Sequence, residues 1–201
     1  MKETLKQLLP LFSSLDIEYR FLGSTVTAAL NGQLHRKIGD LDLLVEEKKH
    51  KELRQALFNL GYKEMGGIFA FGRRFLFLET LVHPHLLSVG YFYGRWQKDG
   101  SFEMGNQLFK ILVESRALVS TPYSLLGFHF KGIPSEALAT EILRSRSNPK
   151  RKAEIELLKN RNIHPLEDKY THVHFLGLSV DWLLRIMTML LNLIGAIRVK
   201  F

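Results

Sequence analysis

Two aspartates inside an apolar segment constrain this chain more than any other feature. Residues 40–46 read DLDLLVE, and the leucines and valine of this segment favour a buried strand. Side chains alternate between the two faces of a strand, so Asp40 and Asp42 share one face while Leu41 and Leu43 occupy the other. Two neighbouring carboxylates repel each other and are costly to bury unpaired. A divalent cation such as Mg²⁺ or Mn²⁺ resolves this conflict; the alternative is a strand end whose carboxylates face water or arginines.

A Gly-Ser pair precedes the aspartates. Residues 17–23 predict a strand, and Ser24 then predicts the N-cap of a short helix that ends before Asn31-Gly32. The start of a helix presents backbone N–H groups, and here also a hydroxyl, to a phosphate. Gly23 allows a phosphate to approach the backbone closely. Taken alone, the pair is better explained as an ordinary turn and cap.

Together the two motifs resemble the signature of the nucleotidyltransferase superfamily of the DNA polymerase β type. The matching residues are Leu22-Gly23-Ser24 and, after a long spacer, Asp40-Leu41-Asp42-Leu43. The spacer is similar to that of the small antibiotic-modifying and abortive-infection-toxin branches, where an Arg and a Gly or His often precede the first Asp. Arg36 and Gly39 stand there in this chain.

The resemblance also implies a third carboxylate on a later strand and basic residues on a later helix. Glu103, in DGSFEMG, is the first candidate for the carboxylate, and Glu79, in FLFLETL, is the second. A helix beginning IPSEAL precedes the basic helix, and the matching residues there are Lys150, Arg151, Lys152 and Glu154.

What the resemblance implies is transfer of a nucleoside monophosphate from a nucleoside triphosphate (NTP) to a hydroxyl acceptor, with release of pyrophosphate. Asp40, Asp42 and Glu103 are the expected catalytic residues and ligands of Mg²⁺ or Mn²⁺. Nucleotide binding is expected of Gly23, Ser24, Arg36, Lys150 and Lys152. The acceptor is a small molecule, RNA or a protein, the last two in a toxin-like role. The alternative is a catalytically silent nucleotide- or RNA-binding module on the same fold.

Composition bounds the partners and the compartment. The formal net charge is +8, and residues 144–161 hold seven Lys and Arg against two Glu. Such a segment attracts polyanions, including nucleic acid and NTP, or else it is simply a solvated helix face. The absence of cysteine excludes disulfides and thiolate metal sites and is consistent with a cytoplasmic protein. The first residues, MKETLKQLLPLFSSL, indicate an amphipathic helix rather than a signal peptide.

We therefore predict an α/β fold, with a mixed, twisted sheet that carries the carboxylates, helices packed on it and a helical C-terminal region. Further helices are predicted over 2–14, 48–62, 106–116, 133–146 and 149–161, and a hairpin turning at Asp99-Gly100. The expected parts are a nucleotidyltransferase core (1–132), a basic helical hairpin (133–163) and an apolar helical tail (164–201). Asp181 and Arg185 interrupt the apolar run 175–197, which favours a helix packed on the domain or on a second copy in a homo-oligomer. Attachment to a membrane surface and a transmembrane span are the alternatives.

Overall fold

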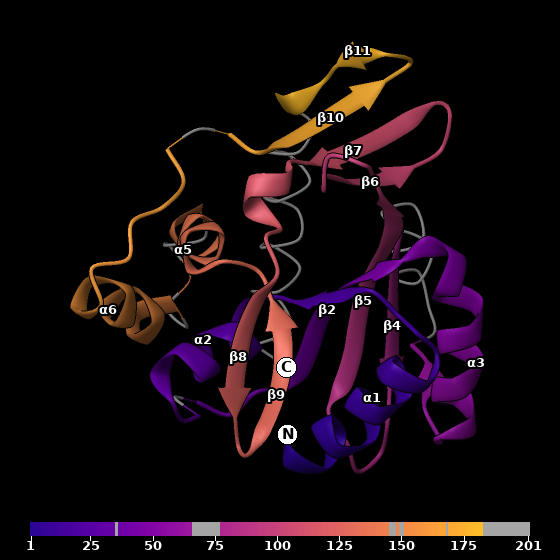
Figure 1. Cartoon of the computed structure of the whole chain (residues 1–201), viewed down its shortest axis with the longest axis vertical. Coiled ribbons are helices and arrows are strands. Elements are labelled where there is room, and N and C mark those ends of the chain that lie inside the picture. Colours follow the sequence, from indigo (N-terminus) through magenta and orange to yellow (C-terminus); the bar gives the residue numbers. More distant parts are fainter. Residues whose placement is uncertain (35, 66–76, 145–147, 149–150, 168, 183–201) are drawn as a thin grey trace.

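A mixed β-sheet centred on two parallel strands organises the molecule (Figure 1). The computed structural model describes residues 1–34, 36–65, 77–144, 148, 151–167 and 169–182. The described helices are α1 (Lys2–Ser14), α2 (Gly23–Asn31), α3 (His50–Asn59), α5 (Ser135–Arg144) and α6 (Lys152–Asn160). The strands are β1 (Tyr19–Phe21), β2 (Asp40–Glu46), β3 (Lys63–Glu64), β4 (Leu78–Val82), β5 (Ser88–Trp96), β6 (Phe102–Gly105), β7 (Phe109–Val113), β8 (Thr121–Leu125), β9 (Phe128–Gly132), β10 (Thr171–Phe175) and β11 (Leu178–Ser179).

The strands follow the order β11-β10-β7-β6-β5-β2-β1-β9-β8, and β4 also pairs with β5 and with β3. β2 and β5 run parallel, with Asp40 opposite Ser88 and Glu46 opposite Gly94. β1 lies antiparallel to β2 on its other side. β5 lies between β2 and β4 at first, and its last residues, Arg95 and Trp96, pair with β6 instead. One long strand thus joins the lower and upper parts of the sheet in Figure 1.

The alternation of acidic and apolar side chains along β2 follows from what lies on the two faces of this strand. Leu41, Leu43 and Val45 are fully buried, as are Val89 and Tyr91 opposite them in β5. Helices α1 and α3 add apolar stripes to this core, and the fully buried side chains among them are Leu5, Leu8, Leu53 and Leu57. Burying one such side chain contributes about 1.5–3 kcal/mol, so this face fixes the register of β2. The same register puts both aspartates on the opposite face.

The hairpin predicted at Asp99-Gly100 is present between β5 and β6. Gly100 has a φ of 82°, a conformation that glycine adopts at little cost, and its N–H donates to the Gln97 carbonyl at 3.0 Å. The helices predicted over 2–14, 48–62, 133–146 and 149–161 correspond to α1, α3, α5 and α6. Where the prediction and the structure agree on a helix, the sequence shows an apolar stripe of helical period followed by a clear turn signal.

One predicted helix is a strand. Residues 106–116 include β7, which pairs with β6 on one side and β10 on the other. Phe109 and Ile111 are buried while Lys110 between them is not, which is the alternation of a strand. Because this run is short, its apolar residues fit both the period of a helix and that of a strand. The pairing of β7 with two neighbouring strands favours the strand.

The C-terminal region also differs from the predicted helical tail. Residues Thr171–Phe175 form β10, which adds to the sheet beside β7, and β11 turns back along it through Leu176 and Gly177. Asp181 accepts the Val173 N–H at 2.6 Å and forms an ion pair with Lys169. Arg185, the other charged residue that interrupts the apolar run 175–197, lies outside the described residues, as do all residues from 183 to 201. Within the part of the chain that the structure describes, no helix is long and apolar enough to cross a membrane.

Candidate active site

β2 presents Asp40 and Asp42 together, on the face that the buried leucines leave free. Asp40 is exposed and Asp42 is partly buried. On the neighbouring strand β5, Ser88 lies opposite Asp40 and Gly90 lies opposite Asp42. A Cβ added at Gly90 would lie only 3.2 Å from the Asp42 carboxylate, so Gly90 makes room for that side chain. The site therefore begins as two carboxylates beside a gap in the row of side chains.

The Gly-Ser pair lies against the same carboxylate. Leu22, which follows β1 and is the N-cap of α2, donates its N–H to the Asp42 carbonyl at 2.9 Å, and α2 starts at the next residue. Gly23 has a φ of 53°, and a Cβ there would lie 3.5 Å from the Asp42 carboxylate. The Thr27 hydroxyl donates to the Gly23 carbonyl at 3.1 Å, which fixes this first turn. The start of α2 and the aspartates of β2, predicted to be neighbours, are brought together.

Asp42 has a strongly perturbed titration. Burial, and after it the nearby carboxylates of Asp40 and Glu141, raise its pKa to about 7, while Arg151 and Arg36 act in the opposite direction. The protein thus holds a carboxylate whose negative charge is poorly compensated by its own residues.

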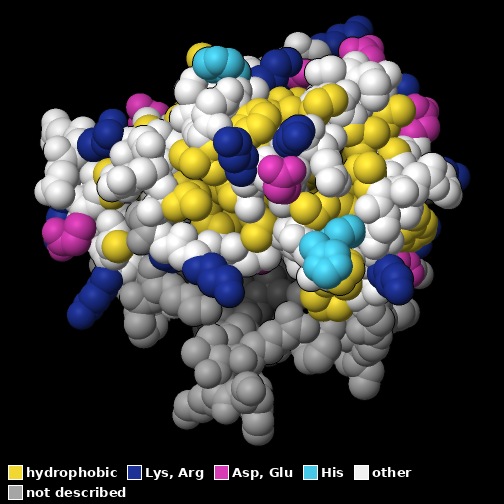
Figure 2. Space-filling view, turned by 90° about the horizontal axis from the view of Figure 1, so that it is seen from below, with side chains coloured by type: hydrophobic (Ala, Val, Ile, Leu, Met, Phe, Trp, Pro, Cys, Tyr) yellow, Lys and Arg dark blue, Asp and Glu magenta, His cyan; other side chains and the backbone are white. Residues whose placement is uncertain are grey.

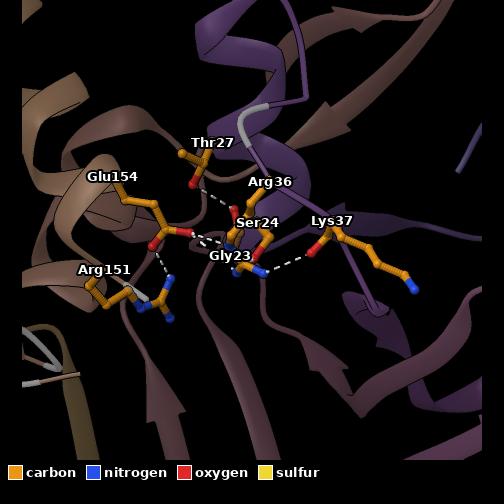
Figure 3. A network of polar contacts seen from close by, with 7 residues as sticks. All are labelled: Gly23, Ser24, Thr27, Arg36, Lys37, Arg151 and Glu154. Atoms are coloured by element: carbon orange, nitrogen blue, oxygen red, sulfur yellow. Dashed lines mark hydrogen bonds and ion pairs between the residues drawn. The ribbon is translucent and has the colours of Figure 1, made fainter. Parts of the chain in front are cut away.

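A network of arginines and a glutamate lies beside the start of α2 (Figure 3). Arg36 donates to the Ser24 hydroxyl and, through Nη2 and Nε, to one oxygen of Glu154 at 3.3 and 3.4 Å. Arg151 pairs with the other oxygen of Glu154. Arg36 comes from the loop before β2, whereas Arg151 and Glu154 come from the start of α6. The network therefore ties α6 to the Gly-Ser turn.

Glu141 is the site residue that the sequence analysis did not single out. It lies on α5, and burial raises its pKa to about 7 despite Arg151 and Arg144 nearby. A signal was present in the sequence, because Glu141 follows the buried Leu138 by three residues and precedes the buried Ile142. An acidic residue on the apolar stripe of an amphipathic helix indicates a special environment.

The two glutamates proposed as the third carboxylate lie elsewhere. Glu103 on β6 lies opposite Arg95, five residues along β5 from Gly90, which corresponds to about 16 Å at the usual rise of a strand. Its carboxylate pairs with Arg95 at 2.6 Å and Lys110 at 3.4 Å. Glu79 lies opposite Tyr91 and thus on the face of β2 that carries Leu43, where it is 4.0 Å from His50. The structure brings neither of them to the aspartates.

The predicted basic residues have three different outcomes. Arg36 lies at the site, as described above. Lys152 is exposed on α6, and Lys150 lies outside the described residues. Arg151, between them, is the one whose charge acts on both Asp42 and Glu141. Spacing along a helix start could not decide between Arg151 and the exposed Lys152.

The donor set suits a hard divalent cation. Asp40 and Asp42 offer carboxylate oxygens on one strand face, and Mg²⁺ commonly takes one or two carboxylates and completes its shell with water and substrate phosphates. Among the described residues, no group of three or more His, Asp or Glu side chains is arranged to hold a metal. Two protein ligands, supplemented by a triphosphate, are therefore what these residues fit.

The fold is similar to that of two antibiotic-modifying proteins of known structure. The lincosamide antibiotic adenylyltransferase LnuA, in its lincomycin-bound form, matches with a TM-score of 0.63 and 18% identity, over 79% of this chain and 96% of that one. The antibiotic-resistance factor ANT(2″)-Ia matches with a TM-score of 0.59 and 14% identity, over 79% and 82% of the two chains. A structure of ANT(2″)-Ia with adenylyl-2″-tobramycin gives a TM-score of 0.58 at 14% identity, over 78% and 84%.

A scan against protein-family models finds no match, and a search of the curated proteins finds none either. At these low identities the structural likeness shows the fold, in agreement with the motifs at Gly23-Ser24 and Asp40-Asp42. The chain has the nucleotidyltransferase fold, in the form found in antibiotic adenylyltransferases.

Proposed function

We propose that this protein transfers a nucleoside monophosphate from an NTP to a hydroxyl group of a small molecule and releases pyrophosphate. One observation carries the proposal: the first turn of α2 lies against the Asp42 carboxylate. A Cβ added at Gly23 would lie 3.5 Å from that carboxylate, which is ordinary contact distance. A helix start of the kind that binds phosphate and a pair of carboxylates of the kind that binds a divalent cation are thereby adjacent. A metal–triphosphate complex needs both groups at once.

Asp40 and Asp42 would hold Mg²⁺, which supplies positive charge to the triphosphate and to the acceptor oxygen. The Ser24 hydroxyl and the first N–H groups of α2 would bind the phosphates that leave. Arg36 donates to the Ser24 hydroxyl, so the hydroxyl's own hydrogen can be directed to a phosphate oxygen. In the reaction, the acceptor oxygen bonds to the α-phosphorus, and the bond from that phosphorus to the bridging oxygen breaks. Pyrophosphate leaves with the electron pair.

The acceptor hydroxyl must lose a proton in this step. We assign the proton to Glu141, because its pKa of about 7 is suited to accepting a proton near neutrality and its charge acts on Asp42. Glu103, which the sequence favoured for this task, is engaged with Arg95 and Lys110 at the other end of β5.

A small acceptor is favoured over RNA. The similar structures are named for small antibiotics, a lincosamide and an aminoglycoside conjugate. On the face seen in Figure 2, Lys and Arg side chains are scattered between apolar patches and acidic residues rather than gathered in one basic block. RNA-binding surfaces are more often continuous basic stripes.

One observation favours the second candidate, a silent nucleotide-binding module. Gly90 stands directly opposite Asp42, so the neighbouring strand supplies no carboxylate at that level. In a silent module, NTP binding persists without turnover. Transfer of label therefore separates the two candidates.

The test uses NTPs labelled at the α-phosphate, with Mg²⁺ and a panel of hydroxyl compounds that includes lincosamides and aminoglycosides. We expect the wild type to label at least one compound and Asp42→Asn to label none while keeping its fold by circular dichroism. Equal turnover by a folded Asp42→Asn protein would contradict the proposed chemistry. NTP binding without labelling of any compound would favour the silent module.

A further inference from the structure

The face of the sheet that carries the aspartates continues beyond them, across β5 to β4. Paired residues of neighbouring strands point to the same face, so Gly90 and Phe92 of β5 share the face of Asp42. Thr80 and Leu78 of β4 lie opposite these two residues and share that face as well. Phe92, Thr80 and Leu78 are partly exposed. The residues that alternate with them are buried on the other face: Glu79, Leu81, Val89 and Tyr91.

The Asp42 carboxylate lies between the start of α2 and this surface. A Cβ added at Gly23 would lie 3.5 Å from its Oδ2, and a Cβ added at Gly90 would lie 3.2 Å from its Oδ1. α2 follows β1, which lies on one side of β2, whereas β5 lies on the other side (Figure 1). A group bound at the start of α2 and a group bound over β5 would therefore meet different oxygens of one carboxylate.

The chemistry of the proposed transfer assigns these two sides. In phosphoryl transfer the attacking and leaving oxygens lie roughly in line, on opposite sides of the phosphorus. The proposed function places the leaving phosphates at the start of α2. The acceptor hydroxyl then approaches from the side of β5, over Gly90, which has no side chain to block it.

The surface on that side is small and uncharged. It consists of the partly exposed residues of β4 and β5 on the face of the aspartates, together with Gly90, and we call it the β4–β5 platform: Ser88, Gly90, Phe92, Leu78, Thr80 and Val82. From Ser88 to Phe92 it extends about 13 Å at the usual rise of a strand, which is the length of a small molecule. It ends at Gly94, where Phe102 and the Glu103 carbonyl of β6 lie against β5.

We propose that the β4–β5 platform binds the acceptor and that Phe92 determines its class, a neutral or weakly charged hydroxyl compound with an apolar ring. This inference rests on the proposed function and deepens it by naming the substrate class. The ring would stack on Phe92 and place a neighbouring hydroxyl over Gly90, beside Asp42. The hydroxyls of Ser88 and Thr80 flank Gly90 and can bond polar groups of the same compound.

The charge of the platform argues against a polycationic acceptor. None of its residues is acidic, and all of them belong to the described part of β4 and β5. Glu79, the carboxylate of β4, is buried on the opposite face of the sheet. A compound with several positive charges would therefore lose its hydration on the platform without gaining an ion pair there.

Steady-state kinetics with an NTP labelled at the α-phosphate, and with each panel compound that the wild type labels, tests the platform. The main variant is Phe92→Ala. Its matched control is Phe128→Ala, the same change at a partly buried phenylalanine of β9, towards the other edge of the sheet. We expect Phe92→Ala to raise the KM for the acceptor roughly tenfold or more, as is typical when the burial of a ring is lost. Phe128→Ala should keep the acceptor KM of the wild type.

Two further readouts separate acceptor binding from a merely structural role of Phe92. The KM for the NTP and the calorimetric affinity for Mg-NTP should be the same in Phe92→Ala as in the wild type, because the NTP lies on the other side of Asp42. The loss in kcat/KM should also be larger for acceptors with an apolar ring than for purely polar ones. Structural damage would instead weaken NTP binding and the use of all acceptors alike.

The panel also tests the proposed class directly. The wild type should label ring compounds that carry at most one positive charge with a higher kcat/KM than polycationic compounds such as aminoglycosides. The opposite preference in the wild type would overturn the inference.

A second variant covers the case in which Phe92→Ala does not fold. Phe92→Leu keeps an apolar side chain in β5 and loses the flat ring, so it should raise the acceptor KM as well. If the wild type labels a compound and a folded Phe92 variant shows the same acceptor KM, only the inference fails. If the folded wild type labels no compound, the inference and the proposed function fail together.

Discussion

At the Asp42 side chain, burial and repulsion by neighbouring carboxylates both oppose ionisation. It lies beside Asp40, is partly buried and is acted on by the charge of Glu141, so its ionised form is disfavoured. The sequence predicted this conflict from the spacing of the two aspartates alone. It could not predict Glu141, whose approach depends on how α5 packs against α2 and the sheet.

The first prediction concerns pH and the metal-free protein. The pKa values of Asp42 and Glu141 are raised to about 7, so the folded state holds more protons than the unfolded state between roughly pH 4 and 7. Stability should therefore fall as pH rises through this window. Asp42→Asn should remove part of that loss, and in EDTA at pH 8 it should be more stable than the wild type by about 1–3 kcal/mol.

Urea denaturation at pH 4 and pH 8 measures this difference. We expect the two proteins to be nearly equal at pH 4, where Asp42 is largely protonated in the folded state. Added Mg²⁺ should raise the stability of the wild type at pH 8 and leave Asp42→Asn nearly unchanged, since ligands stabilise only the state that binds them. If the wild type were more stable than Asp42→Asn in EDTA at pH 8, this would contradict the claim that burial disfavours the ionised form of Asp42.

The second prediction separates binding from chemistry at the glutamates. Glu141→Gln should slow NMP transfer by about 10²–10⁴-fold, the usual contribution of a general base, while KM for the NTP changes little. Glu103→Gln is the control, because Glu103 pairs with Arg95 and Lys110 away from the aspartates. Steady-state kinetics with an NTP labelled at the α-phosphate, and with an acceptor that the wild type labels, measures the transfer rate and the KM of both variants. A large loss in Glu103→Gln with normal turnover in Glu141→Gln would reverse the assignment.

At the scale of elements, β5 decides where the carboxylates lie. Its first half pairs with β2 and sets the level of Asp40 and Asp42, and its end turns away to pair with β6. Gly94 sits where β5 passes β6: a Cβ there would lie 2.5 Å from the Glu103 carbonyl and 2.9 Å from the side chains of Met104 and Phe102. A side chain at this position would push the two parts of the sheet apart.

The third prediction follows from that contact. Gly94→Ala should destabilise the protein by about 1–3 kcal/mol, the usual cost of overpacking a well-packed core. Gly39→Ala is the matched control, because a Cβ at Gly39 meets nothing within 4 Å. Thermal unfolding of the two variants measures the difference. Equal melting temperatures would contradict this prediction, because they would mean that β5 and β6 shift to accommodate the added methyl group at little cost in stability.

Elements were predictable where periodicity and turn chemistry agreed. The stripes of α1 and α3 and the Asp99-Gly100 turn are local signals, so the sequence alone located them. β7 and β10 were missed because each pairs with the other across about sixty residues of chain, and β7 also pairs with β6. Such pairing leaves little trace in a short apolar run.

At the scale of the whole molecule, positive side chains are divided between internal ion pairs and the exposed surface. Arg36 and Arg151 are drawn inward to Glu154, while Lys152, Lys159 and Arg161 remain exposed on or just after α6. The segment that the sequence marked as basic is therefore divided between an internal network and a solvated helix face. The reading as a solvated helix face holds for Lys152, Lys159 and Arg161, while attraction of polyanions by this segment stays a prediction.

The central claim is that one site holds a metal–triphosphate complex between the start of α2 and the aspartates of β2. Calorimetric titration of the wild type with each of the four Mg-NTPs, alongside the Asp40→Ala/Asp42→Ala double variant, tests it most directly. We predict binding of at least one Mg-NTP by the wild type, dependence of that binding on Mg²⁺, and its loss in a folded double variant. Equal Mg-NTP affinity in the wild type and the double variant, or no binding of any Mg-NTP by the folded wild type, would contradict the claim.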